Sequence, residues 1–301
     1  MPTVRSREVT AWRPPVCGIR EVLHARITDH VYPMHTHTAW TLLIVDDGIV
    51  RFDVDRHEHS ALDQLVTLLP PQVAHNGDSV SPHGFRKRVV YLDPVLLGDE
   101  LIGAAATRPV IVDPKLRNRI HLLHVALNQD GEALEAESRL GFVAERLREH
   151  LTGTPRGSRR PSSGIARRLR DLIDARLVEG LTLAEASELL QTHATQLVRS
   201  FTREFGLAPH QYLTSRRVDR ARQLLLEGMP PGLVAAATGF YDQSHFARHF
   251  RNTLGTSPGR YARSVSGTAS VSGIDRKRLS GESSTPHRTK TTEPAVDAHR
   301  V

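Results

Sequence analysis

The sequence predicts an α+β protein of two domains, in which an antiparallel β-barrel or sandwich precedes an all-helical segment. Three observations predict this fold class: short apolar runs broken by turn formers over residues 18–95, helical periodicity over 114–151, and an internal repeat within 164–264. A chain of 301 residues accommodates two cores, because a single core usually serves about 100–200 residues. We therefore expect a barrel domain in residues 1–113 and a helical domain in residues 164–264.

The strands of the first domain are predicted from their length and from the residues that separate them. Apolar runs at 40–45 and 49–54 flank Asp46-Asp47-Gly48, and a third run at 65–69 ends at Pro70-Pro71. Short runs bounded by turn formers are typical of antiparallel strands joined in hairpins. Such strands indicate a small barrel or sandwich.

Residues 114–151 are predicted to form a hairpin of two amphipathic helices that turns near Asp130-Gly131. Their apolar residues recur at heptad spacing: Leu116, Ile120, Leu123 and Leu127, then Leu140, Val143, Leu147 and Leu151. Each stripe needs an apolar partner. Two hypotheses stay open: the stripes form the seam of a homodimer, which we favour, or they pack on the strand domain of the same chain.

Two further stretches lack the apolar residues that a core requires. Residues 152–163 are rich in Gly, Pro, Ser and Arg, which indicates a flexible linker. Residues 265–301 are rich in Ser, Thr and Pro and poor in large apolar side chains. We expect this second stretch to be a disordered tail.

The charge distribution favours a polyanionic partner for the helical segment. The whole chain carries a formal charge of +7, and residues 164–264 alone contain 14 arginines against 9 acidic residues. No apolar run approaches the roughly 18 residues that span a bilayer, and the amino terminus shows no secretory signal. We therefore expect a cytoplasmic protein with no membrane partner. The single cysteine, Cys17, excludes an internal disulfide.

The helical segment repeats itself at an interval of 49 residues. Five residues of the first copy recur in the second with identical internal spacing: Arg199, Phe201, Gly206, Pro209 and Tyr212 match Arg248, Phe250, Gly255, Pro258 and Tyr261. Five such unlike residue types do not coincide readily by chance, so the segment contains two copies of one supersecondary unit.

Each copy contains the signals of two helices joined by a short turn. In the first copy, Thr182 and Glu185 form a capping box, and a second helix at 193–205 ends at Gly206. In the second copy, Asp242 is the expected N-cap of a helix that ends at Gly255. A long helix at 209–227 connects the two copies. Both copies are therefore predicted to be helix-turn-helix units.

In such a unit the second helix enters the major groove of DNA, and the exposed residues of its amino-terminal half contact the bases. These residues are Thr195, Gln196, Val198 and Arg199 in the first copy and Gln243, Ser244, His245 and Arg248 in the second. Arginine matches guanine and glutamine matches adenine. Phosphate contacts are expected from Arg203, Arg216, Arg217 and Arg251, with solvated surface charges as the alternative.

The repeat also resembles a known family. The run GFYDQSHFARHFRNTLGTSPGRY from Gly239 to Tyr261, preceded by LTLAEASELL and ATQLVRSFTREFG, closely resembles the double helix-turn-helix domain of the AraC/XylS bacterial transcription regulators. The resemblance covers about a third of the chain. It implies seven helices, with two recognition helices in successive major grooves on one face of the duplex. Pro230-Pro231 departs from the family pattern, and we expect a shifted helix start there.

The strand domain carries a more diffuse resemblance. His35-Thr36-His37 and the segment from Pro70 to His75 resemble the cupin-like effector domain of many AraC-type regulators. The resemblance implies a jelly-roll barrel that encloses a small molecule. The candidate effector-binding residues are His35, His37, Trp40 and His75.

The three histidines leave alternatives open. They could bind Zn or Fe, because histidines at alternate strand positions point to one face. Enzymatic cupins, however, have a glutamate a few residues after the paired histidines, and Thr41 and Leu42 stand there in this chain. We therefore expect no cofactor and no metal, and favour histidines that line an effector pocket. Metal ligation and a purely structural role stay open.

Together these features predict a sequence-specific, DNA-binding transcription regulator that responds to a small-molecule effector and is not an enzyme. The expected partners are double-stranded DNA, an effector, a second copy of the chain and, for an activator, RNA polymerase. A metal-dependent cupin enzyme fused to a DNA-binding module is the main alternative. A nucleoid-type protein that binds duplex DNA without sequence choice is another.

Overall fold

The computed structural model describes residues 8–28, 30–61, 64–129, 131–153 and 164–266. Most of the predicted linker and nearly all of the predicted tail lie outside these ranges. No helix within them combines the length and the apolar character needed to cross a bilayer.

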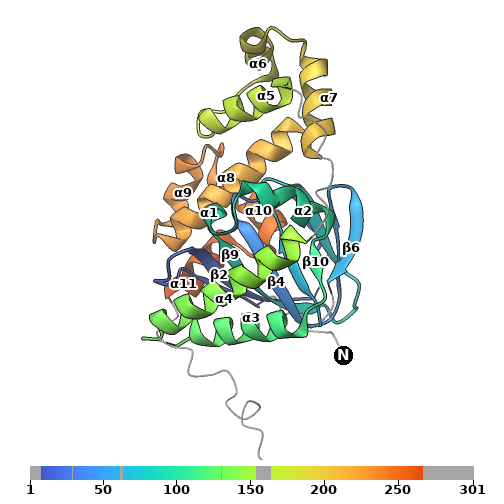
Figure 1. The fold of residues 1–301 in the computed structure, drawn as a ribbon. Helices are drawn as coiled ribbons and strands as arrows, with labels where there is room; N and C mark the ends of the chain where they lie inside the picture. Colours follow the sequence, from blue (N-terminus) through green and yellow to red (C-terminus); the bar gives the residue numbers. More distant parts are fainter. Residues whose placement is uncertain (1–7, 29, 62–63, 130, 154–163, 267–301) are drawn as a thin grey trace, which may run out of the picture. The chain divides into compact units, whose positions relative to one another are not determined.

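The amino-terminal domain contains two antiparallel sheets (Figure 1). The larger sheet has the strand order β1 (Glu8–Trp12), β2 (Ile19–Ile27), β9 (Phe85–Leu92), β4 (Trp40–Asp47), β7 (Val66–Leu69) and β10 (Val110–Ile111). The smaller sheet has the order β3 (Tyr32–His35), β8 (His75–Ser79), β5 (Val50–Val54) and β6 (His57–Ala61). The predicted strands correspond to β4, β5 and β7, whereas β1 was not expected.

Alternation along β4 gives the larger sheet two apolar faces. Leu43 and Val45 belong to the core that also contains Phe52 and Val54 of the smaller sheet, so this face lies inside the barrel. Trp40, Leu42 and Ile44 belong to a second core on the opposite face. Because side chains alternate along a strand, one strand contributes to both cores.

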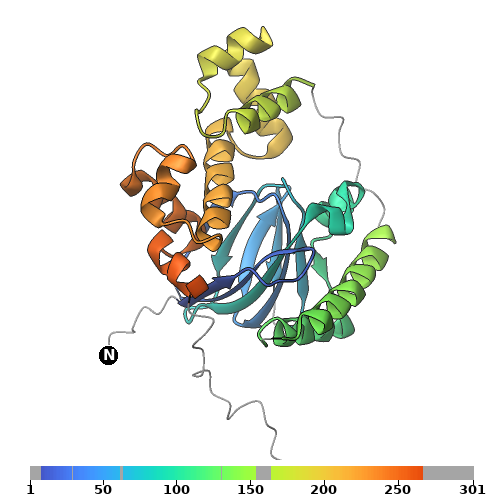
Figure 2. The same ribbon diagram turned by 90° about the vertical axis from the view of Figure 1, so that its left-hand side faces the viewer.

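Helices cover the outer face of the larger sheet. The short elements α1 (Pro94–Leu97), η1 (Asp99–Leu101) and α2 (Ile102–Thr107) precede the predicted hairpin, which consists of α3 (Pro114–Ala126) and α4 (Ala133–Thr152) (Figure 2). Asp113 accepts hydrogen bonds from the backbone N–H groups of Lys115 and Leu116 at the start of α3. The same carboxylate binds Arg146 and His150 of α4, at 2.8 Å each.

The apolar stripes of the hairpin are buried within the chain itself. All eight residues predicted to form a homodimer seam, from Leu116 to Leu151, are at most 8% exposed and pack with Trp40 and Val90 in the outer core. The favoured interpretation of these stripes as a seam is therefore wrong. Helical periodicity identified the buried face, and the sheet of the same chain covers it.

Seven helices make up the described part of the carboxy-terminal segment, as the resemblance implied. They are α5 (Gly164–Ala175), α6 (Leu183–Leu190), α7 (Ala194–Phe205), α8 (Pro209–Leu226), α9 (Pro231–Ala237), α10 (Gln243–Leu254) and α11 (Pro258–Ser266). Pro231 occupies the first position of α9, where its missing N–H removes no helical hydrogen bond.

Candidate DNA-binding helices and barrel site

The first helix-turn-helix unit is formed by α6 and α7. The Thr182 side chain accepts from the Glu185 N–H, and the Glu185 carboxylate accepts from the Thr182 N–H, which completes the predicted capping box. The His193 side chain accepts from the Thr195 N–H and begins α7. Gly206 ends α7 at φ 76°, in the left-handed conformation that glycine adopts without strain.

The amino-terminal half of α7 presents the predicted base-contacting residues. Leu197 and Phe201 face the core, and this orientation turns the intervening positions outward. Thr195, Gln196 and Arg199 are exposed and Val198 is half-buried. Their placement is compatible with contact to DNA.

The second unit repeats this arrangement with α9 and α10. A Cβ on Gly239 would lie 2.2 Å from the Val178 carbonyl oxygen, so only glycine fits this turn. The Asp242 side chain accepts from the His245 N–H at 2.6 Å and caps α10. Gln243, Ser244 and Arg248 are exposed, and His245 is half-buried; Gly255 ends the helix at φ 72°.

One exposed aromatic residue beside α10 was not anticipated. Tyr241 is 92% exposed and lines a shallow hollow together with Asp242, Ser244, His245 and Arg248. Its position directly before the N-cap of a predicted recognition helix is the sequence signal that could have identified it.

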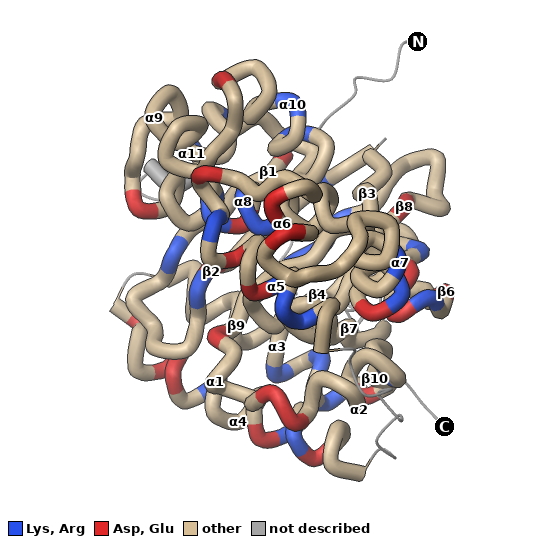
Figure 3. The backbone as a smooth tube through the Cα atoms, turned by 90° about the horizontal axis from the view of Figure 1, so that it is seen from above, with Lys and Arg blue, Asp and Glu red and all other residues tan. Residues whose placement is uncertain are grey.

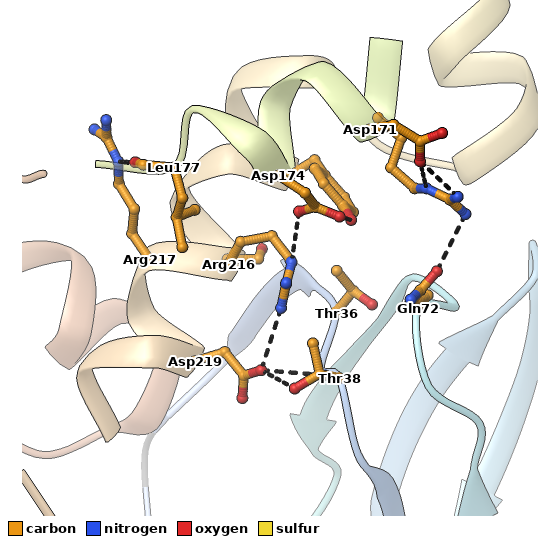
Figure 4. A network of polar contacts seen from close by, with 12 residues as sticks. Thr36, Thr38, Gln72, Asp171, Asp174, Leu177, Arg216, Arg217 and Asp219 are labelled. Carbon is orange, nitrogen blue, oxygen red and sulfur yellow. Dashed lines mark hydrogen bonds and ion pairs between the residues drawn. The ribbon is translucent and has the colours of Figure 1, made fainter. Parts of the chain in front are cut away.

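Two of the arginines predicted to contact phosphate, Arg216 and Arg217, are half-buried and bind groups of the chain itself. The long helix α8 carries several arginines (Figure 3). Arg216 Nε donates to Asp174 Oδ1 at 2.9 Å, and Arg217 Nε donates to the Leu177 carbonyl at 2.8 Å (Figure 4). Burial lowers the pKa of Arg216, but the Asp174 carboxylate outweighs it, and the net pKa is raised. Arg216 thus binds α5 itself and Arg217 binds the turn just after it, while their contact with phosphate stays a prediction.

His35, His37 and His75 come together at one end of the barrel. His35 ends β3 and pairs directly with His75 at the start of β8, while His37 lies two residues beyond β3. All three are buried, with ring centroids 4.5–5.1 Å apart. One ring nitrogen from each lies within 4.8 Å of the others. The structure therefore groups three of the four predicted effector residues.

The local environment keeps these rings neutral. Burial lowers the pKa of His75 to about 4, and burial followed by the neighbouring histidines lowers the pKa values of His35 and His37 well below the ordinary value; nearby cations add to each of these shifts. Lys87 on β9 is one of these cations. Burial, and then the charge of Arg222, lowers the pKa of Lys87 to about 8.

Trp40 does not join the histidine cluster. It is fully buried in the outer core with Leu42 and Ile44, on the face of β4 that α3 and α4 cover. A strand residue and its neighbour point to opposite faces, so proximity in sequence to His37 did not place Trp40 inside the barrel.

The histidine cluster touches the helical segment directly. His37 Nδ1 lies 3.4 Å from Arg222 Nη1 and 3.9 Å from Asp219 Oδ1, both on α8. The other Asp219 oxygen accepts from the Thr38 N–H and hydroxyl, at 3.1 and 2.5 Å (Figure 4). The connecting helix of the two repeats therefore contacts the loop that carries His37.

A buried ion pair adjoins these contacts. Arg222 Nη2 donates to Glu21 Oε2 at 2.7 Å, and the Tyr261 hydroxyl donates to Glu21 Oε1 at 2.5 Å. The Arg222 guanidinium also lies 4.0 Å from the centroid of the Tyr91 ring. Burial alone lowers the pKa of Arg222, but Glu21 and Tyr91 raise it above its ordinary value, so the side chain stays charged. Sequence reasoning did not identify this group.

Comparison with known proteins agrees with the two-domain organisation. Residues 18–144 match the family described as the AraC-like ligand binding domain, and residues 177–264 match the family described as the helix-turn-helix domain. YbfI, an uncharacterized HTH-type transcriptional regulator of Bacillus subtilis, is 24% identical over 222 residues, which cover 71% of this chain and 81% of YbfI. LumQ of Photobacterium leiognathi, a probable transcriptional regulator, is 37% identical over 90 residues, covering 30% of this chain and 36% of LumQ.

Solved structures share the fold. ToxT from Vibrio cholerae O395 has a TM-score of 0.53 at 14% identity, and the match covers 88% of this chain and 100% of ToxT. ToxT from strain SCE256, in a structure with bound unsaturated fatty acid, has a TM-score of 0.51 at 13% identity over 89% of this chain and 98% of that one. With its matching domains, relatives and fold, the chain belongs to the AraC family of transcription regulators, with a ligand-binding β-domain ahead of a double helix-turn-helix domain.

Proposed function

We propose that this regulator recognises its DNA site by inserting the amino-terminal halves of α7 and α10 into major grooves. The observation that carries the proposal is the equivalence of the two helices. Each begins at a side-chain cap, buries its phenylalanines, and leaves an arginine exposed at the same position of the repeat, Arg199 and Arg248. Exposed arginines and glutamines here have the chemistry to select guanine and adenine.

A binding experiment on the DNA upstream of the chain's own gene tests this role. Arg199→Ala and Arg248→Ala should each weaken binding to the preferred site by about 5-fold to 150-fold, which corresponds to about 1–3 kcal/mol per base contact. Binding to unrelated duplex should change much less. Arg108→Ala, at an exposed arginine outside the helical segment, is the matched control. Equal weakening on both DNAs would indicate a non-specific binder.

The barrel is proposed to be the effector site, and the regulator is proposed to act by binding without catalysis. His35, His37 and His75 are the side chains we assign to this site, because they are buried together beside α8. The match of residues 18–144 to the AraC-like ligand binding domain supports this location, and ToxT, which shares the fold, has a structure with bound unsaturated fatty acid. An effector that prefers one arrangement of barrel and α8 would change DNA affinity through a coupling free energy.

We also propose that the chain works in the cytoplasm as a homodimer and, as an activator, contacts RNA polymerase. The dimer contact cannot use the buried stripes of the hairpin. The outer surface of the α3–α4 hairpin still exposes Val125, Leu134 and Phe142, which offer an alternative surface for a dimer contact. Leu134→Glu with Phe142→Glu should convert a dimer to a monomer in analytical ultracentrifugation, and an unchanged mass would place any dimer contact elsewhere.

A further inference from the structure

We propose that His35, His37 and His75 bind one divalent transition-metal ion of the Zn²⁺ type, and that His37 transmits occupancy to the DNA-binding segment through α8. This inference rests on the proposed function, because it names the effector of the same barrel site. It departs from the expectation of no metal, which rested on the missing glutamate. Three protein ligands with one open position are a common arrangement in metal sites that accept a further ligand.

The geometry of the donor atoms matches one small ion. Imidazole nitrogens about 2.0–2.1 Å from Zn²⁺ lie roughly 3.4 Å apart in a tetrahedral site. The three ring nitrogens already lie within 4.8 Å of one another, so small ring rotations complete the site. Imidazole is a preferred ligand of Zn²⁺ and of neighbouring transition metals.

Two of the rings are held in the tautomer that a metal requires. His35 Nδ1 lies 2.7 Å from the Pro33 carbonyl oxygen and His75 Nδ1 lies 3.0 Å from the Val73 carbonyl oxygen. A carbonyl oxygen only accepts, so both Nδ1 atoms carry the proton and both Nε2 atoms keep a free lone pair. Metal-bound histidines in proteins are usually oriented by such a second hydrogen bond.

His37 differs from the other two, and this difference supplies the coupling. Arg222 only donates, so His37 Nδ1 accepts from Arg222 Nη1 at 3.4 Å and the neutral ring carries its proton on Nε2. Coordination through Nε2 moves that proton to Nδ1, with no net gain or loss of protons. The Nδ1–H then repels Arg222 and needs an acceptor, and Asp219 Oδ1 lies 3.9 Å away. Metal binding thus exchanges one α8 partner of His37 for another.

The exchange acts on groups that fix α8 to the barrel. Asp219 also binds the Thr38 backbone and hydroxyl, and Arg222 is held by Glu21. A shift of Asp219 towards His37 therefore changes how α8 is held, and α8 joins the two recognition units. The charges near the three histidines have opposite effects on a bound metal ion. The cations Lys87 and Arg222 disfavour its binding, whereas the carboxylates of Asp219 and Glu21 favour it.

The first experiment measures metal binding by the full chain, purified without a histidine tag and stripped with a chelator. Titration with Co²⁺ should give a visible ligand-field spectrum that saturates at one ion per chain, and Zn²⁺ should displace it. His75→Gln should weaken binding at least about 100-fold, since it removes a ligand. His83→Gln, at an exposed histidine of the same domain, should leave binding unchanged.

A second variant keeps the test valid if His75→Gln misfolds. Lys87→Gln removes a positive charge beside the site and should tighten Co²⁺ binding, an effect that structural damage does not produce. Saturation above one ion per chain, or binding that His75→Gln and Lys87→Gln leave unaltered, would overturn the metal site.

The second experiment measures affinity for the preferred DNA site with and without Zn²⁺. The wild-type chain should change affinity by about 5-fold to 150-fold, a typical allosteric coupling. Asp219→Asn keeps all three ligands, so it should bind the ion and lose most of this change. Equal DNA affinity in the two states of the wild type would overturn the coupling. Metal binding without any sequence-preferring DNA complex would instead count against the proposed DNA role and leave the metal site standing.

Discussion

The two helix-turn-helix units have matching sequences and different surroundings. Phe201 and Phe205 of the first unit pack in a core with Leu169 and Ile173 of α5, and from the barrel only Ala74 and Met34 adjoin that core among the described residues. Phe246 and Phe250 of the second unit, with Tyr261 of the adjoining α11, share one continuous core with Leu43 and Val45 of the barrel. The same local fold is therefore nearly self-contained in one copy and fused to the barrel in the other.

Polar contacts follow the same division. The second unit and the adjoining end of α8 are fixed to the barrel by the Glu21–Arg222–Tyr261 group, and Ser264 Oγ accepts from the Ala11 N–H of β1. The first unit reaches the barrel through a hydrogen bond from Arg56 to the Arg203 carbonyl, and the adjoining α5 reaches it through Arg170, which donates to Gln72. A sequence repeat thus reports the fold of each copy but not its attachment.

The largest expected effect comes from truncating the matched phenylalanines. Phe201→Ala and Phe250→Ala each remove a fully buried ring and should each cost about 4 kcal/mol of local stability. Phe250→Ala should lower hydrogen-exchange protection in the barrel strands as well as in α10, because the core is shared. Phe201→Ala should lower protection in α5, α6 and α7 alone. Equal loss of hydrogen-exchange protection in the barrel strands of both variants would contradict the conclusion that only the second unit shares the barrel core.

Removal of the buried arginine is the next largest test. Arg222→Leu leaves the Glu21 carboxylate buried without its cation and should lower the free energy of unfolding by about 3 kcal/mol, measured in urea. The double variant with Glu21→Leu should recover much of this loss, because no buried charge remains. Arg220→Leu, at an exposed arginine of the same helix, should change stability by less than about 0.5 kcal/mol.

Acid should lower the free energy of unfolding of the barrel domain more than that of α5–α7, by about 2 kcal/mol from His24 alone. Burial, and then Arg88, lowers the pKa of His24 to about 4 from an ordinary 6.5, and its Nε2 lies 3.2 Å from His124 Nδ1. The unfolded chain therefore binds a proton that the folded barrel refuses. This stability is present above pH 6.5, is lost as the pH falls towards 4, and is reduced by about 2 kcal/mol at pH 5.

The fluorescence of Trp12 and Trp40 monitors this titration, since the chain has two tryptophans and both lie in the barrel domain. The midpoint of barrel unfolding that these tryptophans report should decrease when the pH is lowered from 7 to 5. Hydrogen exchange in α5–α7 should change less over the same range. His24→Gln should remove its own share of the dependence, about 2 kcal/mol at pH 5, and leave the share that comes from the buried His35, His37 and His75. A barrel midpoint independent of pH in the wild type would show that His24 is not buried in its neutral form.

The parts of this structure that the sequence predicted are those whose signals lie within one or two helical turns. The capping box of Thr182 and Glu185, the N-cap Asp242 and the terminal glycines Gly206 and Gly255 all depend on neighbours a few residues away. The grouping of His35, His37 and His75 was also anticipated, from the alternate positions of the first two histidines and a third that could join them, although the structure places His37 two residues beyond β3. Trp40 was misplaced because the strand register decides which face of the sheet a residue occupies, and the sequence alone does not give that register.

The features that the sequence did not predict depend on contacts between residues that lie far apart in the chain. Arg222 and Glu21 are separated by 201 positions, and nothing in a run of arginines on α8 distinguishes a buried one from its exposed neighbours. Strand β1 is short, and its packing against α11 involves residues about 250 positions away. The hairpin stripes predicted buried faces correctly, but periodicity does not state whether a sheet or a second copy covers them.

The smallest prediction uses a local signal to probe the attachment of each unit. Thr182→Ala removes the acceptor for the Glu185 N–H and should cost about 1 kcal/mol, measured as lost hydrogen-exchange protection in α6. Asp242→Ala removes the equivalent cap of α10 at a similar cost. Thr182→Ser keeps the acceptor and serves as control. Because the first unit has its own core, the loss of protection in Thr182→Ala should be confined to α5–α7. The loss of protection in Asp242→Ala should extend into β3. A Thr182→Ala effect that reached the barrel strands would mean that the two cores unfold together.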